Sequence, residues 1–142
     1  MRFHVPEHKK LTSETVIPVR WGDMDAMGHV NNTIYFRYFE IARLDWLFSV
    51  GAGAKPDGTG PVIVNAFCNF VRQVSFPGDV RVRHYVANPG RTSFETYLTL
   101  ERVAEPGVLY AEGGAKTVWY DATAGRSVPL PDWLRDLVRA EG

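Results

Sequence analysis

The residues best suited to chemistry lie between Arg20 and Asn32, in the segment RWGDMDAMGHVNN. This segment carries two carboxylates, Asp23 and Asp25, one histidine, His29, and a closing pair of asparagines. It leads into a long apolar stretch, so its last residues are placed to begin a helix. The backbone amides at a helix N-terminus carry a partial positive charge and can donate hydrogen bonds to a developing oxyanion. A carboxylate beside such donors can attack a carbonyl carbon or activate water, which is the equipment of acyl transfer.

The same residue types also have a purely structural interpretation. Asp and Asn are standard residues of turns and helix caps. Asp23 and Asp25 can therefore form turns or a cap, while His29 packs on the first helical turn. Residue types alone favour this structural interpretation over catalysis.

A strand is predicted before this segment and a long helix after it. The strand covers 13–21, where polar and apolar residues alternate, and its shared face carries Thr15, Ile17, Val19 and Trp21. The helix covers 33–50, which contains no Gly or Pro and has twelve apolar residues out of eighteen. Asn31, Asn32 or Thr33 can cap its start. A helix that is apolar around most of its circumference should be largely enclosed by other elements.

Extended segments dominate the rest of the chain. Runs rich in Val, Phe, Tyr, Thr and Leu, separated by Pro-Gly turns, predict strands at 61–74, 79–87, 92–103 and 108–120. Short connections make successive strands antiparallel neighbours. We therefore predict one α+β domain over 1–142, in which a curved antiparallel sheet wraps around one long central helix. Residues 1–11 are expected to form a tail, and 131–140 a short amphipathic C-terminal helix.

Composition excludes several classes of protein. The chain has 142 residues, 45% of them hydrophobic, and its 16 basic and 16 acidic side chains give a formal net charge of zero. A general attraction to nucleic acid or to an anionic membrane is therefore not expected. The single cysteine, Cys68, cannot form an internal disulfide or a cysteine-based zinc site. With no signal peptide or transmembrane run apparent, we expect a cytoplasmic protein.

Metal-dependent chemistry finds little support in the sequence. His4 and His8 are four residues apart, but Pro6 between them opposes the helix that would align them on a metal. The Asp-x-Asp pair is also found in magnesium-dependent phosphatases of the haloacid dehalogenase type. Those enzymes need alternating strands and helices, which four consecutive strands do not provide. No metal and no cofactor are expected.

The segment RWGDMDAMGHVNNTIYFRYFEIAR resembles the signature of hotdog-fold thioesterases, in particular the 4-hydroxybenzoyl-CoA thioesterase-like family of acyl-CoA thioesterases. The resemblance extends over roughly 13–138 and includes the Phe-Pro-Gly-Asp turn at 76–79 and the terminal Pro-Asp-Trp-Leu. It implies that Asp25 is the catalytic carboxylate. It also implies that the backbone N–H of Asn32 donates to the oxyanion and that His29 is a polar site residue.

The resemblance further implies the substrate contacts and the assembly. Asn31 and Tyr35 are expected to contact the substrate, and Arg91 matches a basic position that contacts CoA in the turn between the third and fourth strands. The family builds its site at a subunit interface, so a homodimer is the minimum expected unit and a homotetramer is plausible. The implied activity is hydrolysis of an acyl-CoA thioester to a free acid and CoA, with Asp25 as nucleophile or as general base. The alternative is a non-catalytic protein of the same fold that binds acyl-CoA or an acyl carrier.

Overall fold

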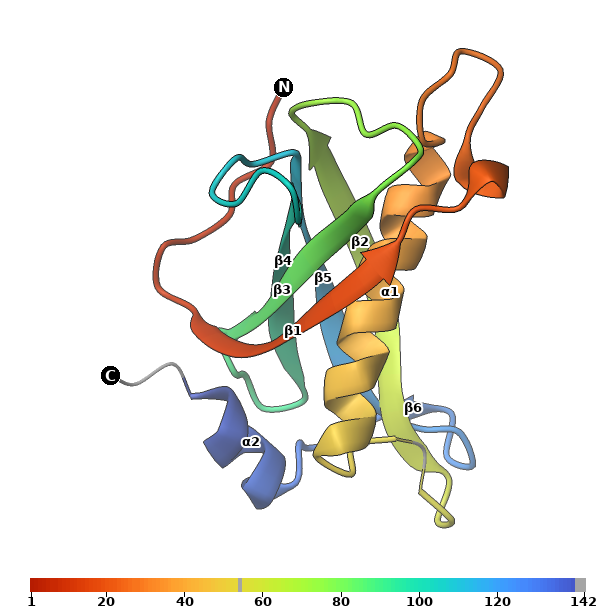
Figure 1. Ribbon diagram of the computed structural model, residues 1–142. Coiled ribbons are helices and arrows are strands. Elements are labelled where there is room, and N and C mark those ends of the chain that lie inside the picture. Colours follow the sequence, from red (N-terminus) through yellow and green to blue (C-terminus); the bar gives the residue numbers. More distant parts are fainter. Residues whose placement is uncertain (54, 140–142) are drawn as a thin grey trace.

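The computed structural model describes residues 1–53 and 55–139, which form one antiparallel sheet with helices packed against it (Figure 1). The strand order is β1-β3-β4-β5-β2, with the short β6 pairing with β5. The predicted α+β class and antiparallel sheet are confirmed. The elements are β1 (Lys10–Pro18), a 3-10 turn (Trp21–Asp23), α1 (Asn32–Ser49), β2 (Thr59–Phe70), β3 (Asp79–Ala87), β4 (Ser93–Arg102), β5 (Ala111–Asp121), β6 (Arg126–Ser127) and α2 (Asp132–Val138).

The position of β2 corrects the predicted order of strands. β2 lies at an edge of the sheet and pairs with β5, so it is not a neighbour of β3. The predicted strand 61–74 is too long at its C-terminal end: β2 ends at Phe70, and residues 71–78 form the connection to β3. A connection of this length can pass the ends of two strands, whereas a tight hairpin cannot.

Helix α1 packs along one face of the sheet, where the strands present apolar side chains. β3 alternates as a half-buried strand should: Val80, Val82, His84 and Val86 are fully buried, and the residues between them are not. On β5, Gly113 allows the helix to approach closely, because a Cβ there would lie 2.6 Å from a ring carbon of Phe39. This close contact explains a glycine in the middle of a strand.

The enclosure of α1 is only partial within a single chain. Tyr35, Phe39 and Trp46 are buried against the sheet. Phe36, Leu44 and Phe48, by contrast, remain exposed, Phe48 to 68%. The sequence predicted a helix covered around most of its circumference, and this chain covers only the sheet-facing side.

The ends of the chain also differ from the prediction. β1 begins at Lys10, so the last two residues of the predicted 1–11 tail belong to a strand. Within that tail, Phe3 exchanges two hydrogen bonds with the side chain of Asn69 on β2. The predicted strand face ends early, because Trp21 lies in the 3-10 turn and is 77% exposed. The C-terminal helix is observed at Asp132–Val138, and residue 140 of the predicted range lies outside the described residues.

Candidate active site

The loop between β1 and α1 is held together by Asp23. Its Oδ2 accepts hydrogen bonds from the Arg20 amide at 2.9 Å and from the Tyr38 hydroxyl at 2.7 Å. Its carbonyl oxygen accepts from the Asn31 amide at 2.9 Å. Burial and the neighbouring Asp23 carboxylate raise the pKa of the Tyr38 hydroxyl, so this donor keeps its proton. Asp23 therefore joins the loop to the helix, which is a structural role.

Asp25 lies at the turn of the same loop with its side chain exposed. Its Oδ1 accepts hydrogen bonds from the amides of Met27 at 2.9 Å and His29 at 3.3 Å. Its own amide donates to the carbonyl oxygen of His29 at 2.8 Å. These contacts orient the carboxylate without enclosing it, so Asp25 is both positioned and accessible.

The first turn of α1 leaves the backbone amide of Asn32 unused among the described residues. Asn31 caps the helix: its Oδ1 accepts from the Thr33 amide at 3.0 Å, and its carbonyl oxygen accepts from the Ile34 amide at 2.9 Å. Within the part of the chain that the structure describes, no acceptor binds the amide of Asn32. An unused amide at a helix N-terminus is a donor suited to an anionic oxygen.

A cavity of about 500 Å³ brings these groups together. Four of the six predicted site residues line it, namely Asp25, His29, Asn32 and Tyr35. A second hollow of about 420 Å³ lies along the same loop and also includes Asp25. The remaining lining residues of the first cavity are Met27, Val30, Phe70, Val71, Arg72 and Gln73.

Tyr35 forms part of the cavity wall and anchors the segment that follows β2. Its side chain is nearly buried, and its hydroxyl oxygen accepts a hydrogen bond from the Val74 amide at 3.1 Å. Burial is the main reason why the pKa of this hydroxyl is raised. Its ring packs edge-on against Phe70, with 5.0 Å between ring centroids. Tyr35 thus fixes the 70–74 segment against the start of α1.

Two predicted binding residues are not among the residues that line the cavity. The side chain of Asn31 is occupied as the helix cap. Arg91 lies in the connection between β3 and β4, at the end of the sheet near α2, whereas the loop before α1 lies at the other end (Figure 1). Its carbonyl oxygen accepts hydrogen bonds from the Leu130 amide and the Arg135 guanidinium, both at 2.9 Å. Within one chain, the CoA contact predicted for Arg91 is therefore remote from Asp25.

Three of the lining residues that the sequence did not predict, Val71, Arg72 and Gln73, lie just beyond the true end of β2. Residues 70–73 were predicted to be strand, yet from Val71 onward they form the connection that closes one side of the cavity. The amides of Val71 and Arg72 both donate to the carbonyl oxygen of Tyr110, at 3.0 and 2.9 Å. Two consecutive amides on one acceptor interrupt the strand pattern. No signal in the sequence marks this point.

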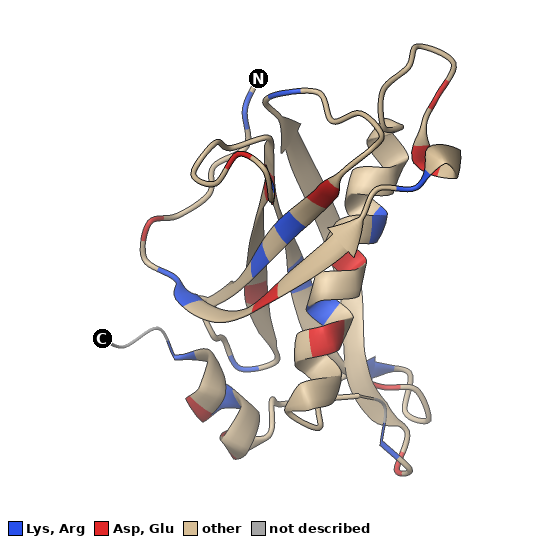
Figure 2. Ribbon diagram, in the orientation of Figure 1, with Lys and Arg blue, Asp and Glu red and all other residues tan. Residues whose placement is uncertain are grey.

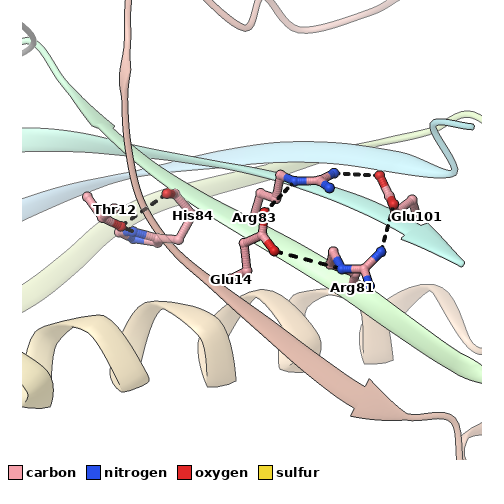
Figure 3. A network of polar contacts seen from close by, with 6 residues as sticks. All are labelled: Thr12, Glu14, Arg81, Arg83, His84 and Glu101. Carbon is pink, nitrogen blue, oxygen red and sulfur yellow. Dashed lines mark hydrogen bonds and ion pairs between the residues drawn. The ribbon is translucent and has the colours of Figure 1, made fainter. Parts of the chain in front are cut away.

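The arginines of β3 are paired, and the single cysteine is unreactive. Arg81 and Arg83 on β3 form a closed set of ion pairs with Glu14 and Glu101, on neighbouring strands (Figure 3). Burial raises the pKa of the Cys68 thiol to about 12, so this thiol stays protonated and is a poor nucleophile. Among the described residues, no group of three or more His, Cys, Asp or Glu is arranged to hold a metal ion. In the same part of the chain, no helix is long and apolar enough to cross a membrane.

Comparison with known proteins identifies relatives along most of the chain. The sequence profile of the thioesterase-like superfamily matches residues 19–138. The solved structure of the PA2801 protein of Pseudomonas aeruginosa, proposed to be a thioesterase, is 37% identical with a TM-score of 0.86, covering 92% of this chain and 100% of that one. A proposed acyl-CoA thioesterase from Xanthomonas campestris is 36% identical with a TM-score of 0.73, covering 83% of this chain and 100% of its own. The YsmA protein of Bacillus subtilis is 28% identical over 82% of this chain and 78% of its own length.

Proposed function

Because the chain belongs to the thioesterase-like superfamily, we propose that it is an acyl-CoA thioesterase, which hydrolyses a thioester to a free acid and CoA. One observation carries the proposal: Asp25, whose side chain is exposed, and Asn32, whose amide has no acceptor among the described residues, line the same cavity. The Xanthomonas relative, proposed to act on acyl-CoA, supports CoA as the carrier.

The proposed chemistry places the thioester carbonyl at the start of α1. The carbonyl oxygen accepts a hydrogen bond from the Asn32 amide, which stabilises the negative charge that develops during attack. In one route a carboxylate oxygen of Asp25 attacks the carbonyl carbon, the C–S bond breaks, and the thiolate leaves and takes up a proton. Water then hydrolyses the resulting mixed anhydride. In the other route Asp25 removes a proton from water, and the water oxygen attacks the same carbon. The C–S bond then breaks, and the leaving thiolate takes up the proton that Asp25 removed, which leaves the free acid and CoA.

His29 is proposed as a polar positioning group in this cavity. Its backbone is tied to Asp25 in both directions, because its amide donates to Oδ1 and its carbonyl oxygen accepts from the Asp25 amide. Its imidazole can hold the thioester or the attacking water beside the carboxylate. Neither route requires a metal or another cofactor.

We also propose that the working unit is a homodimer at minimum, with a homotetramer plausible. β2 is an edge strand, and its residues Val62, Ile63 and Val64 are exposed on both faces of the sheet. The exposed apolar side of α1, described above, provides further surface of the same kind. Large apolar areas and long unpaired edges are normally covered by another chain. A cytoplasmic location and the lack of a nucleic-acid partner stay predictions.

The test of this function is a panel of CoA thioesters, with short, long and aryl acyl groups, scored for release of free thiol. Binding of each thioester to the purified protein is measured alongside by calorimetry. Release of thiol from at least one thioester supports the thioesterase. Binding of acyl-CoA with no thiol release from any member would favour the non-catalytic binding protein instead.

A further inference from the structure

Arg72 is a cation on the wall of the candidate catalytic cavity. It lies two residues beyond the end of β2, in the connection that Tyr35 anchors. Its backbone is fixed by the hydrogen bond from its amide to the carbonyl oxygen of Tyr110 at 2.9 Å. Its guanidinium Nη1 donates to the carbonyl oxygen of Leu109 at 2.8 Å. The first contact fixes the backbone of Arg72 beside the cavity, and the second ties its guanidinium to the segment that precedes β5.

Most of the binding capacity of this guanidinium is free. An arginine has five N–H donors, and the hydrogen bond to Leu109 uses one of them. Within the described residues, no carboxylate lies within 4.0 Å of Arg72, whereas Arg81 and Arg83 are neutralised by Glu14 and Glu101 (Figure 3). The residue is also exposed to solvent. Arg72 therefore presents an uncompensated positive charge at the cavity.

This local charge matters because the protein as a whole does not attract anions. Its formal net charge is zero, and Lys and Arg are interspersed with Asp and Glu over the sheet and α1 (Figure 2). Of the described residues that line the 500 Å³ cavity, Arg72 is the one Lys or Arg. An anionic substrate that enters beside Asp25, itself an acid, needs a cation at the cavity to offset repulsion.

We infer that Arg72 binds an anionic group of the thioester substrate and thereby holds the substrate in the cavity. This inference rests on the proposed function, since it gives Arg72 a role in binding the substrate of the same site. The chemistry is that of a guanidinium with a phosphate or a carboxylate, for which arginine offers paired donors. Two parts of a substrate carry such groups: the phosphates of CoA, and a second carboxylate on a dicarboxylic acyl group.

The test compares Arg72→Gln, which removes the charge and keeps a polar side chain, with Arg72→Lys, which keeps the charge. Arg126→Gln is the matched control, because Arg126 is an exposed arginine on β6, outside the cavity. KM and kcat are measured for acetyl-CoA, succinyl-CoA and acetyl-pantetheine, the last of which lacks the CoA phosphates. Affinity for CoA itself is measured by calorimetry, which needs no activity.

Arg72→Gln is expected to raise KM by ~10–100-fold for the substrate that carries the contacted anion, with kcat changed little. A rise for acetyl-CoA but not for acetyl-pantetheine, together with weaker CoA binding, assigns Arg72 to the phosphates. A rise confined to succinyl-CoA, with unchanged CoA binding, assigns it to the acyl carboxylate. Arg72→Lys should recover part of the loss, and Arg126→Gln should match the parent.

The inference is overturned if Arg72→Gln leaves KM for all three substrates and the affinity for CoA within twofold of the parent. It is also overturned if kcat falls equally for all three while KM is unchanged, since Arg72 would then act on the chemical step. If the parent protein releases no thiol from any thioester, the proposed function fails. The calorimetric comparison with CoA then decides the phosphate assignment separately, and equal CoA affinity in the parent and Arg72→Gln rejects it.

Discussion

The two ends of helix α1 differ in how their backbone hydrogen-bonding groups are satisfied. At the C-terminal end two backbone hydrogen bonds close the helix: Ala52 donates to the carbonyl oxygen of Leu47 at 2.7 Å, and Gly51, with a φ of 74°, donates to that of Phe48 at 3.1 Å. This pattern is a Schellman cap. At the N-terminal end, the Asn32 amide is left without an acceptor in the described part of the chain.

The surroundings of the two ends differ in the same way. The C-terminal end belongs to a closed apolar cluster that includes Trp46, Trp119 and Leu134, each at most 5% exposed. The N-terminal end borders an open cavity with Asp25 and Arg72 on its wall. One helix therefore provides stability at one end and unsatisfied polar groups at the other. Polar groups left free in a cavity reduce stability, and they are what a substrate can use.

The largest effect is expected at the open end, from Asp25→Asn. Asparagine keeps an oxygen that can accept from Met27 and His29, so the loop should hold its shape, but it loses the charge that attacks or accepts a proton. We expect thiol release to fall by ~10²–10⁴-fold, with thermal stability close to that of the parent. Asp136→Asn, which changes an exposed carboxylate on α2, is the control. If Asp25→Asn released thiol at a rate within tenfold of the parent, Asp25 would not be the nucleophile or the general base.

At the closed end, Leu134→Ala should affect stability and not chemistry. Leu134 is fully buried in the cluster around Trp46, so its truncation leaves a cavity. We expect the free energy of unfolding to fall by ~2–5 kcal/mol, measured by urea denaturation. The kcat per folded molecule should be unchanged at a temperature where the variant is folded. A lower kcat without a loss of stability would show that the two ends are coupled.

The pH dependence of stability should also originate in the closed half. The His84 ring stacks on Trp46 at 5.2 Å between centroids, and burial, together with the nearby Arg43, lowers the pKa of His84 to about 3. Between this value and the ordinary histidine pKa of about 6.5, His84 is protonated in the unfolded chain and neutral in the folded chain. Stability is thus full above pH ~6.5 and falls as the pH drops toward 3, by up to ~1.4 kcal/mol per pH unit.

This slope is measured as the urea midpoint between pH 8 and pH 5. His84→Leu removes the titrating ring, while the Thr12 hydroxyl retains the backbone carbonyl oxygen of residue 84 as an acceptor. The variant should show a flatter profile than the parent. If the urea midpoint changed with pH equally in the two proteins, a group other than His84 would cause the loss of stability in acid.

The smallest effect concerns the cap at the open end. Asn31→Ala removes the acceptor of the Thr33 amide and should reduce the free energy of unfolding by ~1 kcal/mol. Asn31→Asp keeps the acceptor and should remain close to the parent in urea denaturation. If Asn31→Asp instead raised KM at unchanged stability, Asn31 would contact substrate, as the sequence resemblance implied.

The sequence indicates which residues gather around the candidate site because they are close together along the chain. Asp25, His29 and Asn32 lie within eight residues, so short hydrogen bonds and the start of one helix bring them together. The helix itself was predicted within one residue at each end, since its apolar pattern and flanking caps are also local. The wrong assignment of Trp21 to the strand also has a local cause. The alternation of polar and apolar residues extends beyond Pro18 in the sequence, whereas pairing of β1 with β3 ends at Pro18.

The linear order of residues therefore determined the α+β class, the long helix and the carboxylate that precedes it. Tertiary structure alone decided that β2 pairs with β5, that Arg72 reaches the cavity, and that Arg91 lies at the remote end. The physical reason is the distance along the chain over which each interaction acts. Hydrogen bonds and helical periodicity act over a few neighbouring residues, whereas the choice of strand partner depends on how the whole sheet buries its apolar face against α1.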